Sequence, residues 1–357
     1  MDLSDRKLIL GCALFFALYL VSPMLGDASQ LMPGDLTRAI FSLGRLWVLS
    51  DAGELSFARE GQDKWTVESF PERVLDLCNR DGHPTVITGA KDDAAAWTIR
   101  GHRGDQWSIE AVIQSEDDGL ISMDCRPDRV TVITARRLVE VIGDRQTTVP
   151  LSSELKRGLI NPTYGTEDRV FLGRDSGEWG GGLRSIDRSN GEITVLERNE
   201  SGDLCGGPLS TSCDPVTGIA PEPWKPDCVA VAVGLIHFAP HGRIVEVCGS
   251  EIRRLYYKPY TDPFGAKPRS GRRKDDEPFS TVAFFGLVGD SDTLLTAGID
   301  GIYRIGSGGV VQFFPQPQFK EIGGIKLSFD LPHVVLVLTG INRRESVSGL
   351  VPLLVPR

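Results

Sequence analysis

Outside its first 28 residues the sequence lacks any sustained helical stripe, and only the segment from Leu151 to Arg157 could form a helical turn or two. It also lacks a basic surplus, because 39 Lys and Arg stand against 48 Asp and Glu, a net charge of −9. This balance disfavours a nucleic-acid binder, which needs a basic face. No cysteines have the Cys-x-x-Cys spacing of a zinc knuckle. We therefore expect no nucleic-acid partner, no metal and no other cofactor.

What the chain has instead is short apolar or alternating runs bounded by turn residues. The 40 Gly and 22 Pro indicate frequent tight turns. Runs with the two-residue alternation or continuous apolar character of strands include 46–49, 130–133, 192–196, 229–233, 243–247, 301–305 and 334–338. With 41% hydrophobic and 24% charged residues, the composition is that of an ordinary globular protein. The sequence predicts an all-β domain.

The strands recur at a nearly constant interval. A strand that follows a tight turn returns at 53–57, 95–99, 137–141, 182–186, 251–255, 301–305 and 349–353, so the intervals are 42, 42, 45, 69, 50 and 48 residues. A period of about 40–50 residues with four short strands is typical of a propeller blade. We predict a seven-bladed β-propeller over residues 29–357, with insertions around 199–228 and 258–280. The last unit has room for only three strands, so residues 29–42 are expected to supply the fourth and close the ring.

The first 28 residues have the pattern of an export signal. Arg6 and Lys7 precede an apolar run from Leu8 to Val21, Pro23 breaks the helix, and Gly26-Asp27-Ala28 offers a signal-peptidase site. We expect cleavage after Ala28 and a secreted or periplasmic protein. The alternative is an uncleaved membrane anchor over residues 8–25, which is just long enough to span a bilayer. A lipoprotein box ending at Cys12 is disfavoured, because only four apolar residues precede it.

Cleavage would leave six cysteines, an even number that favours disulfides in an oxidising compartment. Six cysteines allow 15 pairings. Their positions suggest Cys78–Cys125 between successive units, Cys228–Cys248 across a hairpin, and Cys205–Cys213 within a proline-rich loop. The sequence alone leaves this choice open.

One turn resembles a known family. Arg100-Gly101-His102 followed by Gly104-Asp105-Gln106-Trp107 resembles the Asp-box turn of BNR-type propellers, and residues 60–65 resemble the same turn with one extra residue. Residues 180–192 are similar to blade hairpins of many bacterial propellers. The resemblance implies fold and not activity. The family includes sialidases, but the nearest matches to their Arg-Ile-Pro signature, at Arg243 and Arg304, both lack the proline. Sialidase chemistry is therefore disfavoured.

Few residues suggest a site. Trp179 with Glu178, and Trp224 in the loop between Cys205 and Cys248, could present aromatic rings on one rim to a protein or a glycan. The alternative is that each Trp covers its own blade. His237 and His241 are four residues apart, but Pro240 prevents the helix that would align them for a metal. The basic cluster at residues 269–274 is expected to form a solvated loop, because acidic residues follow it.

The resulting hypothesis is an exported, non-enzymatic propeller that binds a protein or carbohydrate of the cell envelope through rim loops. Its rival is an extracytoplasmic hydrolase or lyase with carboxylates near the propeller axis, for which Asp76, Asp124 and Glu178 are the candidate acids. Membrane contact is expected only if the N-terminal segment stays uncleaved.

Overall fold

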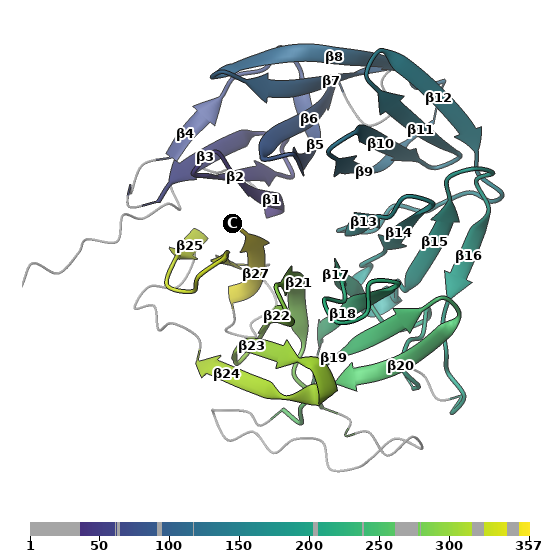
Figure 1. Ribbon diagram of the computed structural model, residues 1–357, viewed down its shortest axis with the longest axis vertical. Helices are drawn as coiled ribbons and strands as arrows, with labels where there is room; N and C mark the ends of the chain where they lie inside the picture. Colours follow the sequence, from purple (N-terminus) through teal and green to yellow (C-terminus); the bar gives the residue numbers. More distant parts are fainter. Residues whose placement is uncertain are drawn as a thin grey trace, which may run out of the picture.

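The computed structural model describes residues 36–60, 62, 65–90, 95–116, 118–202, 206–237, 239–260, 278, 280–315, 325–340 and 350–357. These residues form seven antiparallel sheets arranged in a ring, a β-propeller (Figure 1). Within the described residues, the helical elements are two single 3-10 turns, η2 (Gly177–Trp179) and η3 (Ser307–Gly309). The all-β class and the seven blades are confirmed. The predicted signal, residues 1–28, lies outside the described residues.

The first six blades each run from the axis outwards. Blades 1 and 2 consist of β1 (Leu36–Ser42), β2 (Arg45–Ser50), β3 (Leu55–Arg59) and β4 (Trp65–Glu68), then β5 (Arg73–Arg80), β6 (His83–Gly89), β7 (Ala96–Arg103) and β8 (Gln106–Gln114). Blades 3 and 4 consist of β9 (Leu120–Arg126), β10 (Arg129–Thr134), β11 (Arg137–Ile142) and β12 (Arg145–Pro150), then β13 (Thr163–Gly165), β14 (Arg169–Gly173), β15 (Leu183–Asp187) and β16 (Ile193–Leu196). Blades 5 and 6 consist of β17 (Val216–Pro221), β18 (Cys228–His237), β19 (Ala239–Cys248) and β20 (Glu251–Tyr256), then β21 (Phe284–Asp290), β22 (Thr293–Gly298), β23 (Gly301–Gly306) and β24 (Val311–Pro315).

Blade 7 is wound in the opposite direction. Its described strands are β25 (Ile325–Ser328), β26 (Val334–Gly340) and β27 (Leu350–Pro356), in that order across the sheet. The C-terminal strand β27 is the innermost, because it packs against β21 and β1, the inner strands of the two neighbouring blades (Figure 1).

The predicted closing strand is wrong for the part that the structure describes. Residues 36–42 form β1, which pairs with β2 in blade 1 and not with blade 7; residues 29–35 lie outside the described residues. The reason is the turn at Leu43 and Gly44, where φ values of 55° and 68° make the tight hairpin that joins adjacent antiparallel strands. The ring closes instead through apolar packing of Val335, Val337 and Val355 against blade 1.

The strand that recurs in the sequence every 40–50 residues or so is the third strand of the sheet in five of the seven blades. In blade 5 it falls on the outermost strand β20, because the long hairpin β18–β19 already fills the second and third positions. In blade 7 it falls on β27. Alternation of apolar residues marks a half-buried strand but does not say which position in the sheet it takes.

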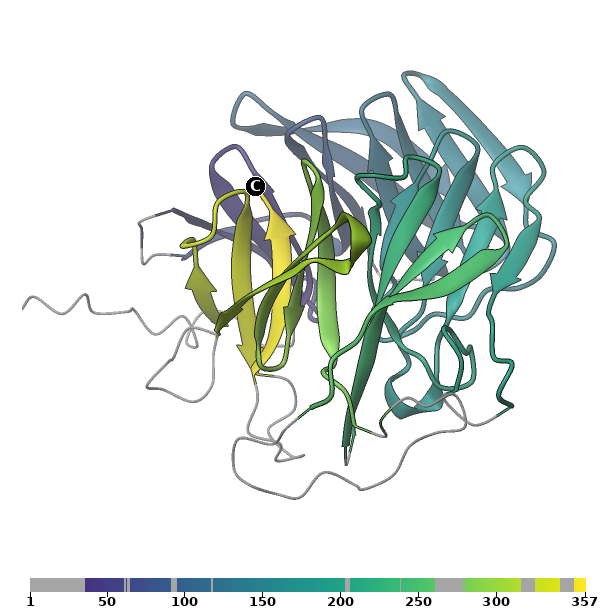
Figure 2. The same ribbon diagram turned by 60° about the horizontal axis from the view of Figure 1, so that its bottom comes forward.

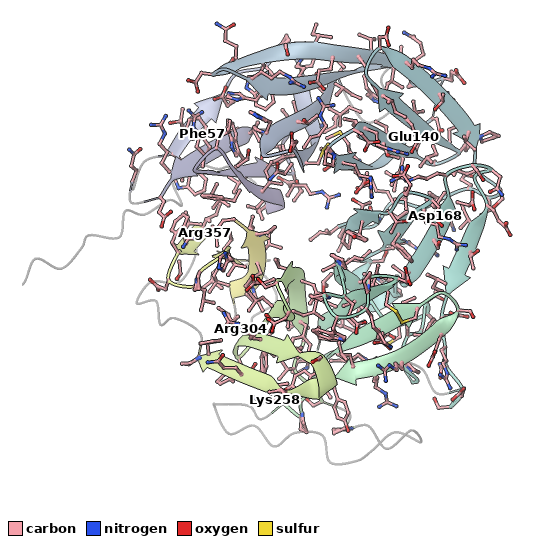
Figure 3. All side chains as sticks on the ribbon, in the orientation of Figure 1. Phe57, Glu140, Asp168, Lys258, Arg304 and Arg357 are labelled. Carbon is pink, nitrogen blue, oxygen red and sulfur yellow. A yellow bond between two sulfur atoms is a disulfide. The ribbon has the colours of Figure 1, made fainter. Side chains whose placement is uncertain are left out.

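The core lies between neighbouring blades and not in one central cluster. Blades 2 and 3, for example, share a cluster that includes Trp97, Ile99, Val130 and Val139, all fully buried. Side chains fill the interfaces all around the ring (Figure 3). Each blade therefore buries both faces of its sheet only when the ring is complete.

The structure describes the two expected insertions to different extents. Residues 216–221 of the first expected insertion, 199–228, form β17, the inner strand of blade 5. Most of the second, residues 261–277 and 279, lies outside the described residues. Its base is held by a bridge between Pro259 and Thr281.

Candidate functional site

Three connecting loops join at one end of blades 4 and 5. The loop between β14 and β15 pairs with the segment before β13, since Leu159 N donates to Asp175 O at 2.6 Å and Asp175 N donates to Ile160 O at 3.0 Å. On its other side, Gly181 N donates to Thr211 O and Gly182 N donates to Asp214 O. The loops are thus fixed to one another through their backbones. In Figure 2 the long connections of these blades lie below the strands.

The glycine triplet at 180–182 is what lets these loops approach. A Cβ atom on Gly180 or Gly181 would overlap backbone atoms of the neighbouring loop or of Arg174, and one on Gly182 would overlap Thr211. Gly180 and Gly182 also have φ values of 83° and 81°, where side chains are strained. No other residue type fits all three positions.

A fully buried charged cluster packs between these loops and the strands of blade 5. Arg243 Nη2 donates to Asp214 Oδ2 at 2.6 Å, and Arg243 Nε donates to the Pro208 carbonyl at 2.7 Å. Arg243 Nη1 lies 2.7 Å from His241 Nε2. Nε2 of His241 also lies 3.3 Å from Asp214 Oδ1, so Asp214, His241 and Arg243 form one buried cluster. His241 therefore has a structural role here, and the side chain of His237 lies outside the described residues.

On the side away from this cluster the loops expose apolar side chains. Trp179 is 81% exposed and Leu159 is 75% exposed, the two highest values among the large hydrophobic residues that the structure describes. Glu178 beside Trp179 is also exposed. We call Leu159, Glu178 and Trp179 the rim patch. A Trp side chain on a rigid loop offers a large contact area at little entropic cost.

Asp175 anchors the rim-patch loop at its first residues. Its carboxylate accepts a hydrogen bond from Gly177 N at 2.8 Å. Burial raises the pKa of Asp175 to about 6, and the Gly177 hydrogen bond opposes this only in part. The loop is therefore held by a carboxyl group that ionises near neutral pH.

Trp224 does not share this rim. It lies in the turn before Cys228, and this turn is at the Cys248 end of the β18–β19 hairpin, since Cys228 pairs with Cys248. The rim patch is at the other end, because Asp214 of its supporting cluster contacts His241, which pairs with Leu235. Trp224 is half-buried against the apolar cluster of blades 5 and 6. For Trp224 the alternative interpretation, that it covers its own blade, is the one that the packing supports.

The candidate acids take part in different blade interfaces. Asp76 accepts from Arg38 Nε at 2.8 Å and from Met123 N at 2.7 Å. Asp124 lies between blades 3 and 4, with its Oδ2 3.4 Å from Arg188 Nη2. Burial raises the pKa of Asp124, and Arg188 opposes that shift. Asp76 and Asp124 are thus each tied to an arginine, and Glu178 belongs to the rim patch.

Two of the suggested disulfides are present. Cys78–Cys125 joins the inner strands of blades 2 and 3, and Cys228–Cys248 joins β18 to β19; both are drawn in yellow in Figure 3. Cys213 is also disulfide-bonded, while Cys205, the partner suggested for it, lies outside the described residues. Among the described residues, the one set of three possible metal ligands is Glu222, Cys228 and Cys248, in which the two sulfurs are bonded to each other.

A polar pocket that the sequence did not reveal lies at the opposite end of the ring, between blades 2 and 3. Its volume is about 210 Å³, and it is lined by residues of the β5–β8 ends together with Pro127. Glu110 Oε1 accepts from Arg80 at 2.6 Å and from Arg103 at 3.3 Å, while Glu110 Oε2 is buried without a hydrogen-bond partner. Gly101 makes room for this carboxylate. In the sequence, a glycine inside a strand, Gly101, was the one feature that could have indicated a close approach of this kind.

The comparisons with known proteins identify the architecture. No protein-family model matches the chain, and no curated protein matches it by sequence. Among solved structures, U3-55K has a TM-score of 0.53 at 11% identity, over 91% of this chain and 96% of that one. Inactive virginiamycin B lyase from Staphylococcus aureus, solved with quinupristin, has a TM-score of 0.50 at 15% identity, over 88% of this chain and 93% of that one.

A third similar structure is the extracellular domain of the putative one-component system BT4673 from B. thetaiotaomicron. Its TM-score is 0.51 at 14% identity, over 87% of this chain and 38% of that one. These likenesses show the β-propeller fold. At such low sequence identities, the activities and ligands of these proteins are not assigned to this chain.

Other sequence features lie partly or wholly outside the described residues. The basic cluster at 269–274 and the possible anchor at 8–25 are among them. Within the described residues, no helix is long and apolar enough to cross a membrane. The two disulfides are of the kind that forms in oxidising compartments outside the cytoplasm.

Proposed function

We propose that this chain is an exported β-propeller that binds a protein or carbohydrate partner of the cell envelope through the rim patch. The observation that carries the proposal is the 81% exposure of Trp179 on a loop that is fixed by its neighbours. Trp is one of the residue types most enriched among the side chains that carry the binding energy of interfaces.

The rigidity of the patch supports binding. The loop is bonded on both sides by backbone hydrogen bonds and lies over the buried Asp214–Arg243 pair. A loop whose backbone is already positioned loses less conformational freedom when a partner covers it. The rim patch thus meets the main requirement of a preorganised contact surface.

The composition of the patch favours a protein over a carbohydrate. Leu159 is 75% exposed on the segment that is hydrogen-bonded to the Trp179 loop. An exposed aliphatic side chain on the segment next to the Trp179 loop suits an apolar side chain of a protein. A sugar ring also stacks on Trp, but it needs several hydrogen-bonding groups as well.

The rival hypothesis of an axial carboxylate enzyme has less support. Asp76 and Asp124 belong to different blade interfaces, and each is bonded to an arginine that holds it in place. The similar structures include a lyase and an extracellular domain, so the fold itself does not decide between catalysis and binding.

Affinity capture from the native envelope tests the proposal. The tagged wild-type protein and its Trp179→Ala variant are compared with a Val310→Ala variant, since Val310 is 72% exposed on the β23–β24 turn. We expect the partner to be retained by wild type and by Val310→Ala, and its affinity to fall at least about tenfold with Trp179→Ala. Equal retention by all three proteins would contradict the proposal.

A further inference from the structure

The short turn between β17 and β18 places charged groups next to the Cys228–Cys248 disulfide. Three prolines, at 221, 223 and 226, alternate with polar residues here. The turn is closed by Glu222 N donating to Cys228 O at 3.1 Å and by Cys228 N donating to Lys225 O at 2.9 Å. Glu222 and Lys225 are therefore fixed relative to the two sulfurs.

Lys225 lies beside the more accessible sulfur. Its Nζ is 4.0 Å from Cys248 Sγ and 3.0 Å from Glu246 Oε1. Cys248 is half-buried, whereas Cys228 is 6% exposed. A neighbouring ammonium group stabilises a thiolate and so makes a cysteine a better nucleophile at neutral pH and a better leaving group.

Glu222 lies beside both sulfurs. It is 1% exposed, and its carboxyl group is paired with another carboxyl group, that of Glu246. One of its oxygens lies within 4.8 Å of each of the two Sγ atoms. A buried carboxyl group placed beside a second carboxyl group is costly when ionised, so its presence calls for a reason.

From this arrangement we propose that Cys228–Cys248 is a thiol–disulfide exchange site, with Lys225 and Glu222 as its positioning residues and a dithiol, protein-bound or small, as its substrate. In the reducing direction, a thiolate of the dithiol attacks Cys248 Sγ and forms a mixed disulfide. The Cys228–Cys248 bond breaks, and its electron pair leaves on Cys228 Sγ, which takes a proton from Glu222. The second thiolate of the dithiol then attacks the other sulfur of the same dithiol, the one bonded to Cys248 in the mixed disulfide. This step closes the dithiol's own disulfide and releases Cys248 as a thiolate beside Lys225.

The balance is a two-electron exchange. The dithiol becomes a disulfide and gives up two protons, and the protein disulfide becomes two cysteine thiols. One proton reaches Cys228 through Glu222, which regains a proton from solvent, and the other is available to Cys248. The reverse sequence oxidises a dithiol partner.

The protonation state of Glu222 fits this role. Burial, and next the Glu246 carboxylate, raise the pKa of Glu222 to about 7, while Lys225 and Arg253 oppose the shift. Hydrogen bonding from Arg253 lowers the pKa of Glu246 to about 2. Near neutral pH Glu222 can therefore both give and take a proton, and Glu246 stays ionised.

The other described disulfide provides an internal control. Cys78 and Cys125 are also half-buried, but they pack against the apolar cluster of blades 2 and 3. Folded protein is incubated with a fixed excess of dithiothreitol for increasing times, free thiols are alkylated, and both pairs are quantified by peptide mass spectrometry. We expect Cys228–Cys248 to be reduced at a rate at least about tenfold higher than Cys78–Cys125.

The variants separate chemistry from packing. Glu222→Gln should abolish the inflection near pH 7 in the rate of Cys228–Cys248 reduction, and Lys225→Gln should lower that rate severalfold. Arg254→Gln, which removes a cation of strand β20 that lies over the Tyr257 ring, is the matched control and should leave the rate nearly unchanged. Equal reduction of both disulfides, or an unchanged pH profile in Glu222→Gln, would overturn the proposal.

Discussion

The guanidinium of Arg38 in blade 1 donates to the Asp76 carboxylate of blade 2 at 2.8 Å and to the Asn161 carbonyl, just before blade 4, at 2.8 Å. The same guanidinium also donates to Ser122 of blade 3. One side chain near the axis thus ties four blades together. Asp76, expected from the sequence as a candidate catalytic acid, is a structural partner in this tie.

Removal of Asp76 should destabilise the ring. Asp76→Ala leaves Arg38 and the Met123 amide without their acceptor, and we expect the free energy of unfolding to fall by about 2–3 kcal/mol. Chemical denaturation measures this change. Glu200→Gln, which breaks the exposed Arg198–Glu200 pair, is the control and should cost less than about 1 kcal/mol.

Gly181→Ala should disturb the rim-patch loop. The new Cβ would overlap the Arg174 carbonyl, so the loops must separate, and we expect a loss of about 2–3 kcal/mol in the free energy of unfolding. In Gly119→Ala the Cβ meets nothing within 4 Å, so this control should be neutral or stabilising by up to about 1 kcal/mol. Similar losses in both variants would argue against the close approach of the loops.

The raised pKa of Asp175 predicts that the stability of the protein depends on pH. Because its pKa rises from 3.8 to about 6 on folding, the folded state binds more protons between these values. Its contribution to stability is complete below pH about 4 and is lost as the pH rises through about 6. Asp175→Asn should therefore gain about 2 kcal/mol relative to wild type between pH 4 and 7. Thermal unfolding of both proteins across this range measures the difference, and a difference independent of pH would contradict the assignment.

The two described disulfides should differ in their effect on stability. Cys78 and Cys125 are 47 residues apart on different blades, whereas Cys228 and Cys248 are 20 residues apart in one hairpin. Loop-closure entropy then predicts losses of about 4 and about 3 kcal/mol on replacement of each pair by Ala. Denaturation of the two double variants tests the order, and a larger loss from the hairpin pair would contradict it.

Strand type and blade number were predictable from the sequence, because turn glycines and alternating apolar residues recur with a nearly constant period. The closing strand was not predicted correctly. Leu43 and Gly44 form the turn that commits β1 to blade 1, but leucine at positive φ is uncommon and gives no sequence signal. The reverse winding of blade 7 depends on the contacts of β27 with β1 and β21, which are remote in sequence.

The site was predictable only in part. Trp179 stood out because glycines follow it, and it is exposed; Trp224 stood out because prolines flank it, and it packs against its own blade. Leu159 carried no signal, since an isolated leucine after a glycine is common in any loop. Its relation to Trp179 arises from backbone hydrogen bonds between segments of different blades.

Site-specific photo-cross-linking tests the central claim most directly. A photoreactive phenylalanine analogue is placed at position 159 of the rim patch and, as controls, at the exposed positions of Val112 on β8 and Val310 on the β23–β24 turn. Irradiation of the protein in its native envelope should give one defined adduct from position 159, lost when Trp179→Ala is added, and none of that species from the controls. The same adduct from position 112 or 310, or an adduct from position 159 that persists without Trp179, would contradict the account.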